Sequence, residues 1–175
     1  MILGLDISTS ITGYTIVDGE KVVENGAWDT RKYKDFFEKV KHVKTKVDEI
    51  HKRYNNKIAA IYIEQSLQSF RSGFSSAKTL STLSRFNGVV SWLVFDKFGL
   101  KPEYLAATSA RKLCGIKVSR GEKAKPTVLK FLLDNEPSFV IYYTRNGNPK
   151  PDSYDRADSM VIAKAGHICE QKSVS

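Results

Sequence analysis

The chain has 175 residues, of which 41% are hydrophobic, and this is enough for one domain with a sizeable core over residues 1–175. Lysine and arginine (28) outnumber aspartate and glutamate (19), and the net charge of +9 favours a polyanionic partner, with nucleic acid as the leading candidate. Cys114 and Cys169 have no Cys or His partner at metal-ligand spacing, which argues against a zinc site and a disulfide framework and predicts reduced thiols. The first residues have no basic lead-in and no apolar run approaches the length of a membrane span, so we expect neither a signal peptide nor a membrane anchor.

The first three predicted elements are strands. Apolar, β-rich runs over residues 2–7 and 12–18 are separated by a Ser-Thr-Ser turn, and a third run over residues 21–28 follows an Asp-Gly turn. These short spacers predict an antiparallel three-stranded meander. The first strand carries Asp6 among apolar neighbours, where an ionised carboxylate is costly unless a cation or hydrogen-bond donors compensate it.

Helices and strands alternate over the remainder of the chain. Residues 33–54 place apolar side chains at steps of three and four on one helical face, with mostly lysine on the other. An apolar run at residues 58–64 predicts a buried strand. After it we expect, in order, a helix over 75–98, a strand over 103–106, a basic connector, and helices over 123–135 and 153–170. This alternation indicates an α/β domain with a mixed five-stranded sheet flanked by helices.

The helix over residues 75–98 is apolar on more than one face. Its apolar residues include Leu80, Leu83, Val89, Val90, Trp92, Leu93, Val94 and Phe95. Such a helix is either deeply buried or also faces a partner subunit, and burial in the core is the interpretation that we favour.

Four carboxylates stand on these elements. Asp6 lies in the first strand and Glu64 ends the fourth, while Asp155 and Asp158 are three residues apart on the last helix, a spacing that turns both to one face. If the start of that helix packs across the two strands, the four acids converge. Like charges held close repel unless cations lie between them, and hard oxygen ligands suit Mg²⁺ or Mn²⁺. Two such ions about 4 Å apart would bind the attacking water and the leaving oxygen of a phosphodiester.

Each acid also has a structural interpretation. Asp6 could accept hydrogen bonds from the turn that follows it, and Glu64 could pair with a lysine. Asp152, Asp155 and Asp158 could simply favour the N-terminus of a helix. For any single acid we prefer this explanation, whereas all of them together, in this order and on these elements, favour a metal site.

A basic segment lies between the last strand and the last helix. Over residues 111–130 its seven cations face one acid, Glu122. Such an excess would neutralise backbone phosphates and stabilise the negative charge that develops in a transition state. The cations are Arg111, Lys112, Lys117, Arg120, Lys123, Lys125 and Lys130.

Three tyrosines near the last helix leave two interpretations open. The Asn-Gly-Asn-Pro stretch at residues 146–149 predicts a loop within the domain. Tyr142, Tyr143 and Tyr154 lie close to it and could stack on nucleic-acid bases or pack in the core.

Five stretches together carry a family resemblance. They are residues 4–14 (GLDISTSITGY), 63–65 (IEQ), 108–112 (TSARK), 121–125 (GEKAK) and 154–163 (YDRADSMVIA). The first resembles the opening of the RuvC family of Holliday-junction resolvases, the second its second acidic strand and the last its final acidic helix. The two basic stretches resemble the segment before and at the start of its penultimate helix. The likeness covers nearly the whole chain.

This resemblance implies an RNase H-like nuclease fold and a homodimer that resolves a four-way DNA junction by paired metal-dependent nicks. It implies that Asp6, Glu64, Asp155 and Asp158 hold Mg²⁺, with two ions per site and Mn²⁺ able to substitute. Metal-activated water would be the nucleophile, and hydrolysis would leave a 5′-phosphate and a 3′-hydroxyl.

The resemblance also implies DNA contacts. Lys112 and Lys123 would lie near the scissile phosphate. The sequence departs from the family after Gln65, where the family places an aromatic side chain that stacks at the junction centre and a Ser-Leu pair follows here. Phe70 and Phe74 are the candidates to replace it. The other cations expected to contact DNA are Arg111, Lys117, Arg120 and Lys125.

Two other functions stay open. Residues 6–12 also resemble a phosphate-binding hairpin of actin-like ATPases and sugar kinases, although the chain is short for two such lobes and lacks a second Gly-rich phosphate loop. A non-catalytic branched-DNA-binding protein of the same fold would not need all four acids. We therefore expect a Mg²⁺-dependent endonuclease that acts on branched DNA in the cytoplasm, of bacterial or phage type, with an organellar origin left open.

Overall fold

The computed structural model describes residues 1–54, 56–65 and 77–173. Its first three strands are β1 (Ile2–Asp6), β2 (Ile11–Asp18) and β3 (Lys21–Asp29). They pair antiparallel in chain order, so the predicted meander is confirmed.

Two further strands, β4 (Ala60–Glu64) and β5 (Glu103–Leu105), extend the sheet on the other side of β1. β4 pairs in parallel with both β1 and β5, which gives the strand order β3-β2-β1-β4-β5. The sheet is therefore mixed and five-stranded, as the sequence predicts. Because β1 and β4 are parallel neighbours, their carboxyl ends meet at one edge of the sheet.

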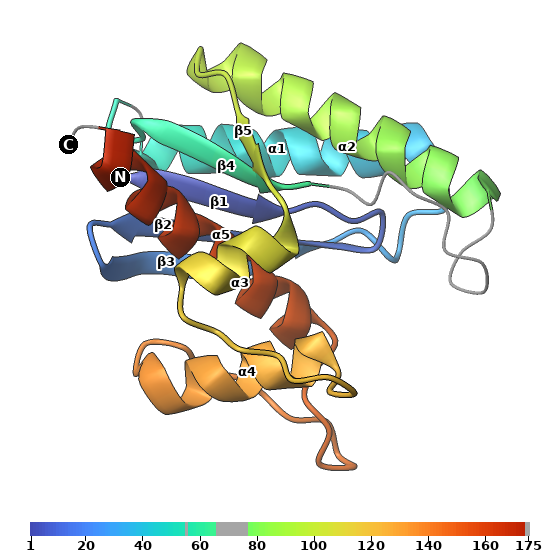
Figure 1. Ribbon diagram of the computed structural model, residues 1–175. Coiled ribbons are helices and arrows are strands. Elements are labelled where there is room, and N and C mark those ends of the chain that lie inside the picture. Colours follow the sequence, from blue (N-terminus) through green and yellow to red (C-terminus); the bar gives the residue numbers. More distant parts are fainter. Residues whose placement is uncertain (55, 66–76, 174–175) are drawn as a thin grey trace.

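Helices cover both faces of the sheet (Figure 1). α1 (Phe36–Tyr54) and α2 (Ala77–Phe98) enclose one apolar core against the first face. α5 (Asp152–Ser173) crosses the second face, where α3 (Ala107–Leu113) and α4 (Ala124–Asn135) join it around a second core. In the part of the chain that the structure describes, no helix combines the length and the apolar composition that crossing a membrane requires.

One segment differs from the prediction. Residues 107–113, which we expected within a basic connector, form the short helix α3. Seven residues are too few to show apolar periodicity, and a helix this short depends on tertiary packing. Ala110 is fully buried, and Leu113 packs against the core on the α5 side of the sheet. The sequence segment therefore becomes helical through contacts that its own pattern does not reveal.

The apolar helix α2 is divided between core and surface. Val90, Leu93 and Val94 are buried, whereas Trp92 is 58% exposed and Phe95 is 47% exposed. Burial in the core is therefore correct for the first three residues and wrong for the other two.

Candidate active site

Asp6 and Glu64 end two neighbouring parallel strands, so they stand side by side at the carboxyl edge of the sheet. Side chains alternate between the two faces of a strand. Asp6 is in phase with Gly4, and Glu64 is in phase with Tyr62, and both of these residues contact α5. Both carboxylates therefore lie on the face of the sheet that α5 covers.

The hydroxyl-rich turn after β1 does not account for the carboxylate of Asp6. The Ser8 N–H donates to Thr12 Oγ1 (3.4 Å), the Thr12 hydroxyl donates to the Ser8 carbonyl (3.2 Å), and the Ser10 N–H donates to Ser8 Oγ (3.2 Å). Within the described residues these groups bond to one another rather than to Asp6. The alternative role for Asp6, as an acceptor for this turn, is therefore not supported.

Two glycines let α5 approach the sheet closely. A Cβ on Gly13 would overlap the carbonyl oxygen of Asp155, and a Cβ on Gly4 would overlap Ala163. Glycine at these positions allows the helix backbone to lie directly on β1 and β2. Asp155 and Asp158 are thereby brought to the cavity at the strand ends.

A hydrogen-bond network fixes the first turns of α5 on the sheet. The Asn25 amide donates to the Arg156 carbonyl (3.0 Å) and to the Thr15 hydroxyl (2.8 Å), and Arg156 Nε donates back to Asn25 Oδ1 (2.9 Å). The hydroxyls of Thr15 and Ser159 are bonded at 2.9 Å in the buried interface. Because Arg156 and Ser159 each adjoin one of the two acids of α5, these bonds set the position of both carboxylates. The sequence alone does not reveal this network, since Asn25 and Arg156 are 131 positions apart and no local pattern joins them.

Three carboxylates form a compact cluster. Oxygen atoms of Asp6, Glu64 and Asp158 lie within 4.8 Å of one another. Asp155 is outside this closest set but lines the same cavity, whose volume is about 200 Å³. The structure therefore brings all four predicted acids together, three as a cluster and Asp155 beside them.

The four acids are in an environment that disfavours their charged forms. Burial raises the pKa of Asp6 well above its usual range, and repulsion by the other three acids raises it further. Burial, and then repulsion by Asp158, raises the pKa of Glu64 to about 7. Burial also raises the pKa of Asp158 and, to about 6, that of Asp155. Four carboxylates with raised pKa values in one cavity are typical of a functional site in which a bound cation stabilises the charged acids.

The donor set fits a hard divalent cation. Carboxylate oxygens are the ligands that Mg²⁺ and Mn²⁺ prefer. Asp6, Glu64 and Asp158 offer three such oxygens within 4.8 Å of one another, and Asp155 lies in the same cavity. A bound cation would offset the burial and the repulsion that raise the four pKa values.

Lys125 is a cation that meets the acid cluster. Its ammonium lies 3.9 Å from Asp158 Oδ2, and its side chain lines the cavity of the four acids. Burial lowers the pKa of Lys125, but the nearby carboxylates, Asp158 first, outweigh burial and raise it. The charges of Lys125 and Arg111 in turn act against burial at both Glu64 and Asp158.

The two lysines selected by the family resemblance are placed differently. Lys112 and Lys123 are exposed, and neither lines the cavity of the four acids. Lys112 instead lines, with Arg111 and Lys117, a basic cavity of about 280 Å³. Lys123 directly precedes α4. The remaining predicted DNA contacts are Arg120, exposed between α3 and α4, and Phe70 and Phe74, which lie outside the described residues.

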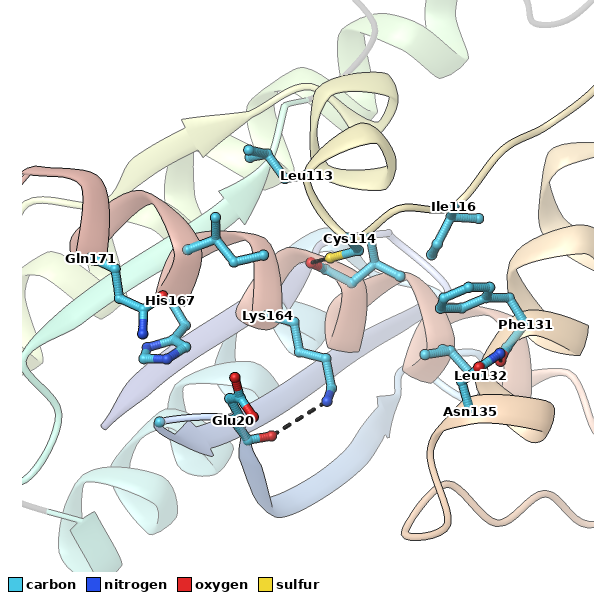
Figure 2. A pocket seen from close by; sticks show the side chains of 13 residues that line it. Glu20, Leu113, Cys114, Ile116, Phe131, Leu132, Asn135, Lys164, His167 and Gln171 are labelled. Carbon is cyan, nitrogen blue, oxygen red and sulfur yellow. Dashed lines mark hydrogen bonds between the residues drawn. The ribbon is translucent and has the colours of Figure 1, made fainter.

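A third cavity lies near the opposite edge of the sheet and has a volume of about 330 Å³ (Figure 2). Several of its polar groups are engaged: Lys164 pairs with Glu136 and donates to the Glu20 carbonyl (3.4 Å). The Cys114 thiol donates to the Val161 carbonyl (3.5 Å). Burial raises the pKa of Cys114 to about 11, so the thiol is protonated near neutral pH and is a poor nucleophile. The acid cluster, not this cavity, is therefore the candidate active site.

Comparison with known proteins identifies the fold. No family model and no curated protein sequence matches the chain. The structure of Thermus thermophilus RuvC in complex with a Holliday junction substrate aligns with a TM-score of 0.66 at 16% identity, over 98% of this chain and 94% of that one. Another Thermus thermophilus RuvC structure gives 0.62 at 18% identity (98% and 96%), and the yeast mitochondrial Holliday junction resolvase Ydc2 gives 0.60 at 15% (99% and 82%). The chain thus has the RNase H-like fold of the RuvC resolvases over nearly its whole length.

Proposed function

We propose that the protein is a divalent-metal-dependent endonuclease that resolves four-way DNA junctions by paired symmetric nicks. The observation that carries this proposal is the cluster of Asp6, Glu64 and Asp158, whose oxygens lie within 4.8 Å of one another at the strand ends. The fold shared with RuvC and Ydc2 supports the same conclusion, and so does the net charge of +9.

The acidic residues would hold the metal ions. Asp6, Glu64 and Asp158 would bind Mg²⁺ or Mn²⁺, and Asp155 would contribute to a site for two ions. Such ions, when bound, lower the pKa of water and stabilise the leaving oxygen of a phosphodiester. Lys125, beside the cluster, would attract the scissile phosphate to the acids that would otherwise repel it. The products would carry a 5′-phosphate and a 3′-hydroxyl.

The basic residues of α3, of the segment that follows it and of the start of α4 would bind the DNA backbone on the approach to the acids. Arg111, Lys112 and Lys117 line one cavity, and Lys123 and Lys125 lie at the start of α4. Each cation that neutralises a phosphate releases a counterion, so we expect junction binding to weaken steeply as the salt concentration rises.

Paired nicks require two active sites, which supports a homodimer. Trp92 and Phe95 are exposed on α2 and lie three residues apart, hence on one side of the helix. A two-fold symmetric contact would bury this surface against its counterpart in a second copy. We therefore propose α2 as part of the dimer interface.

The decisive experiment compares synthetic four-way, three-way and linear duplex DNA in Mg²⁺, with the nick positions mapped on each strand. We expect two nicks placed symmetrically across the four-way junction, little cleavage of linear DNA, and no cleavage in EDTA. A matched Glu64→Gln protein shows whether any cleavage comes from a contaminant. A wild-type protein that binds junctions tightly in Mg²⁺ but cuts none would instead be the non-catalytic DNA-binding protein.

A further inference from the structure

An ordered hairpin separates α4 from α5. The Lys150 N–H donates to the Tyr142 carbonyl (2.8 Å), and the Thr144 N–H donates to the Asn148 carbonyl (2.7 Å). Between these bonds, Tyr143 pairs with Pro149 in an antiparallel bridge. Figure 1 shows this segment projecting away from the sheet, at the same end of the molecule as the start of α5. The hairpin is therefore a defined protrusion rather than an irregular connection.

Two tyrosines of the hairpin are presented to solvent. Tyr142 is 61% exposed and Tyr143 is 56% exposed. Consecutive residues of an extended arm point to opposite sides, so each side of the hairpin carries one ring. Tyr154, by contrast, packs against the core, so core packing explains that residue alone.

The hairpin carries positively charged side chains as well as aromatic rings. The Lys150 ammonium lies 5.6 Å from the centre of the Tyr142 ring. Arg145 is exposed near the tip, and residues 140–151 include no acid. Aromatic rings interleaved with cations are the combination that binds nucleic-acid strands, because rings stack on bases while cations neutralise phosphates.

Two hydrogen bonds attach the base of the hairpin to the start of α5. Arg156 Nη2 donates to the Val140 carbonyl (2.9 Å), and the Ser153 N–H donates to the Lys150 carbonyl (3.0 Å). Arg156 directly follows Asp155, one of the four acids of the cavity. The hairpin is thus attached to the first turns of the helix that carries Asp155 and Asp158.

We propose that this hairpin binds the DNA next to the cleavage site, with Tyr142 and Tyr143 stacking on bases that the branch point leaves exposed. Arg145 and Lys150 would bind the adjoining phosphates. In linear duplex DNA the bases are covered by their neighbours, so the two rings find such surfaces only at a branch or on a single strand. The inference rests on the proposed function in taking branched DNA as the partner.

The test uses the full chain and two double variants. Tyr142→Ala with Tyr143→Ala removes both rings, and Tyr142→Phe with Tyr143→Phe keeps them as the matched control. Binding is measured in EDTA to a four-way junction, to single-stranded oligothymidine and to linear duplex. We expect the alanine variant to bind the junction and the single strand about 10-fold more weakly, with less than about 2-fold change on duplex. The phenylalanine variant should match the wild type, and all three proteins should have the same thermal midpoint.

A fluorescent base makes the stacking itself visible. With 2-aminopurine at the branch point, the wild type and the phenylalanine variant should change its fluorescence, and the alanine variant should not. Lys57→Ala serves as a charge control for Arg145→Ala, because Lys57 is exposed and lies before β4, away from its carboxyl end. Arg145→Ala should weaken binding and its dependence on salt, whereas Lys57→Ala should change neither.

The outcomes separate this inference from the proposed function. If the wild type cuts junctions and the alanine variant binds the junction and the single strand as well as wild type, the hairpin inference is wrong and the nuclease stands. If the wild type cuts no junction but the alanine variant alone loses single-strand binding, the hairpin inference stands and the nuclease does not. A changed mass in light scattering with unchanged DNA affinity would make the tyrosines a protein contact and overturn the inference.

Discussion

The ammonium of Lys125 lies 3.9 Å from Asp158 Oδ2, so the start of α4 places a positive charge on the acids of α5. The lysine side chain is 61% exposed, and an ion pair of this kind contributes little to stability. Its position matters more, because the lysine and a bound metal ion would be attracted to the same carboxylates. Because the Lys125 side chain is largely exposed, a DNA phosphate near the cluster would provide a new partner for it.

Lys125→Ala should therefore slow single-turnover cleavage at saturating protein by at least about 10-fold, while junction affinity changes by less than about 3-fold. The Mg²⁺ concentration for half-maximal rate should fall, since the acids lose a competing cation. Lys130→Ala on the same helix is the matched control and should leave the rate unchanged. Equal losses in rate and affinity would assign Lys125 to general electrostatic binding.

The family resemblance makes a competing prediction for Lys112→Ala and Lys123→Ala, which it expects to slow cleavage more than they weaken binding. The geometry favours Lys125, because neither Lys112 nor Lys123 lines the cavity of the acids. Single-turnover rates of the three alanine variants, measured together, rank these lysines. A larger rate loss for Lys123→Ala than for Lys125→Ala would favour the resemblance over the geometry of the free protein.

The convergence of the four acids could be predicted from the sequence, whereas the tertiary contacts that hold them in place could not. Asp6 lies within an apolar run and Glu64 ends one, so the local sequence shows both strands and the unusual charge in each. That Lys125 rather than Lys123 lies next to the acids depends on how α4 packs against α5, and no periodic pattern in the sequence shows this packing. Asn25 and Arg156 meet only in the folded chain, and α3 is too short for a pattern. Local signals thus predicted the elements, and tertiary contacts decided which side chains meet.

The metal-free protein should lose thermal stability as the pH rises from about 4 to about 7. An acid whose pKa is higher in the folded state binds more protons when folded, so the free energy of unfolding falls as the pH rises between the two values. This interval runs from 4.5 to about 7 for Glu64 and from 3.8 to about 6 for Asp155. Thermal midpoints in EDTA across this range measure the effect.

Adding Mg²⁺ at the upper pH should restore stability. An ion at about 100 times its Kd raises the free energy of unfolding by about 2.7 kcal/mol, which corresponds to about 5–10 °C for a chain of this size. In Glu64→Gln both the pH slope and the response to Mg²⁺ should be smaller. A wild-type thermal midpoint that changes with neither pH nor Mg²⁺ would contradict a charged metal site.

Gly13→Ala should destabilise the fold, because the new Cβ would overlap the carbonyl oxygen of Asp155. Overpacking of this kind costs about 1–3 kcal/mol, and the shift of α5 should also reduce cleavage per folded molecule. Gly88→Ala on the helix α2 is the matched control, since a Cβ there would meet none of the described residues within 4 Å. That substitution should stabilise the protein by up to about 1 kcal/mol. A thermal midpoint lower than wild type for Gly13→Ala and higher than wild type for Gly88→Ala would confirm the close approach at Gly13.

Replacing Trp92 and Phe95 together by glutamate should convert the proposed homodimer to a monomer. Two buried charges facing their symmetry copies would oppose association, whereas both positions are exposed in the single chain, so the fold should survive. Light scattering reports the mass, and junction assays report whether nicks remain paired. Leu133→Glu, at an exposed apolar residue of α4, is the control. A wild-type protein that is strictly monomeric and still makes paired nicks would contradict the dimer.

Asp158→Asn keeps the shape of the side chain and removes one charge from the cluster that holds Asp6 and Glu64. Cleavage should fall by at least about 10²-fold, because a neutral amide is a poorer Mg²⁺ ligand. Junction binding in EDTA should be retained or become tighter, since one source of repulsion toward phosphate is lost. Asp134→Asn, at an exposed acid near the end of α4, is the control and should change neither property.

The alternative role for Asp158, a favourable charge at a helix N-terminus, predicts a different result. That role acts mainly in the first turn, and α5 begins at Asp152, so Asp158 already lies in the second turn. A helix-terminus residue would lower the thermal midpoint when replaced and leave the rate per folded molecule unchanged. A metal ligand would instead lower the rate and reduce the stabilisation by Mg²⁺. If the folded variant cuts at nearly the wild-type rate, Asp158 does not belong to the metal site and the cluster loses its third ligand.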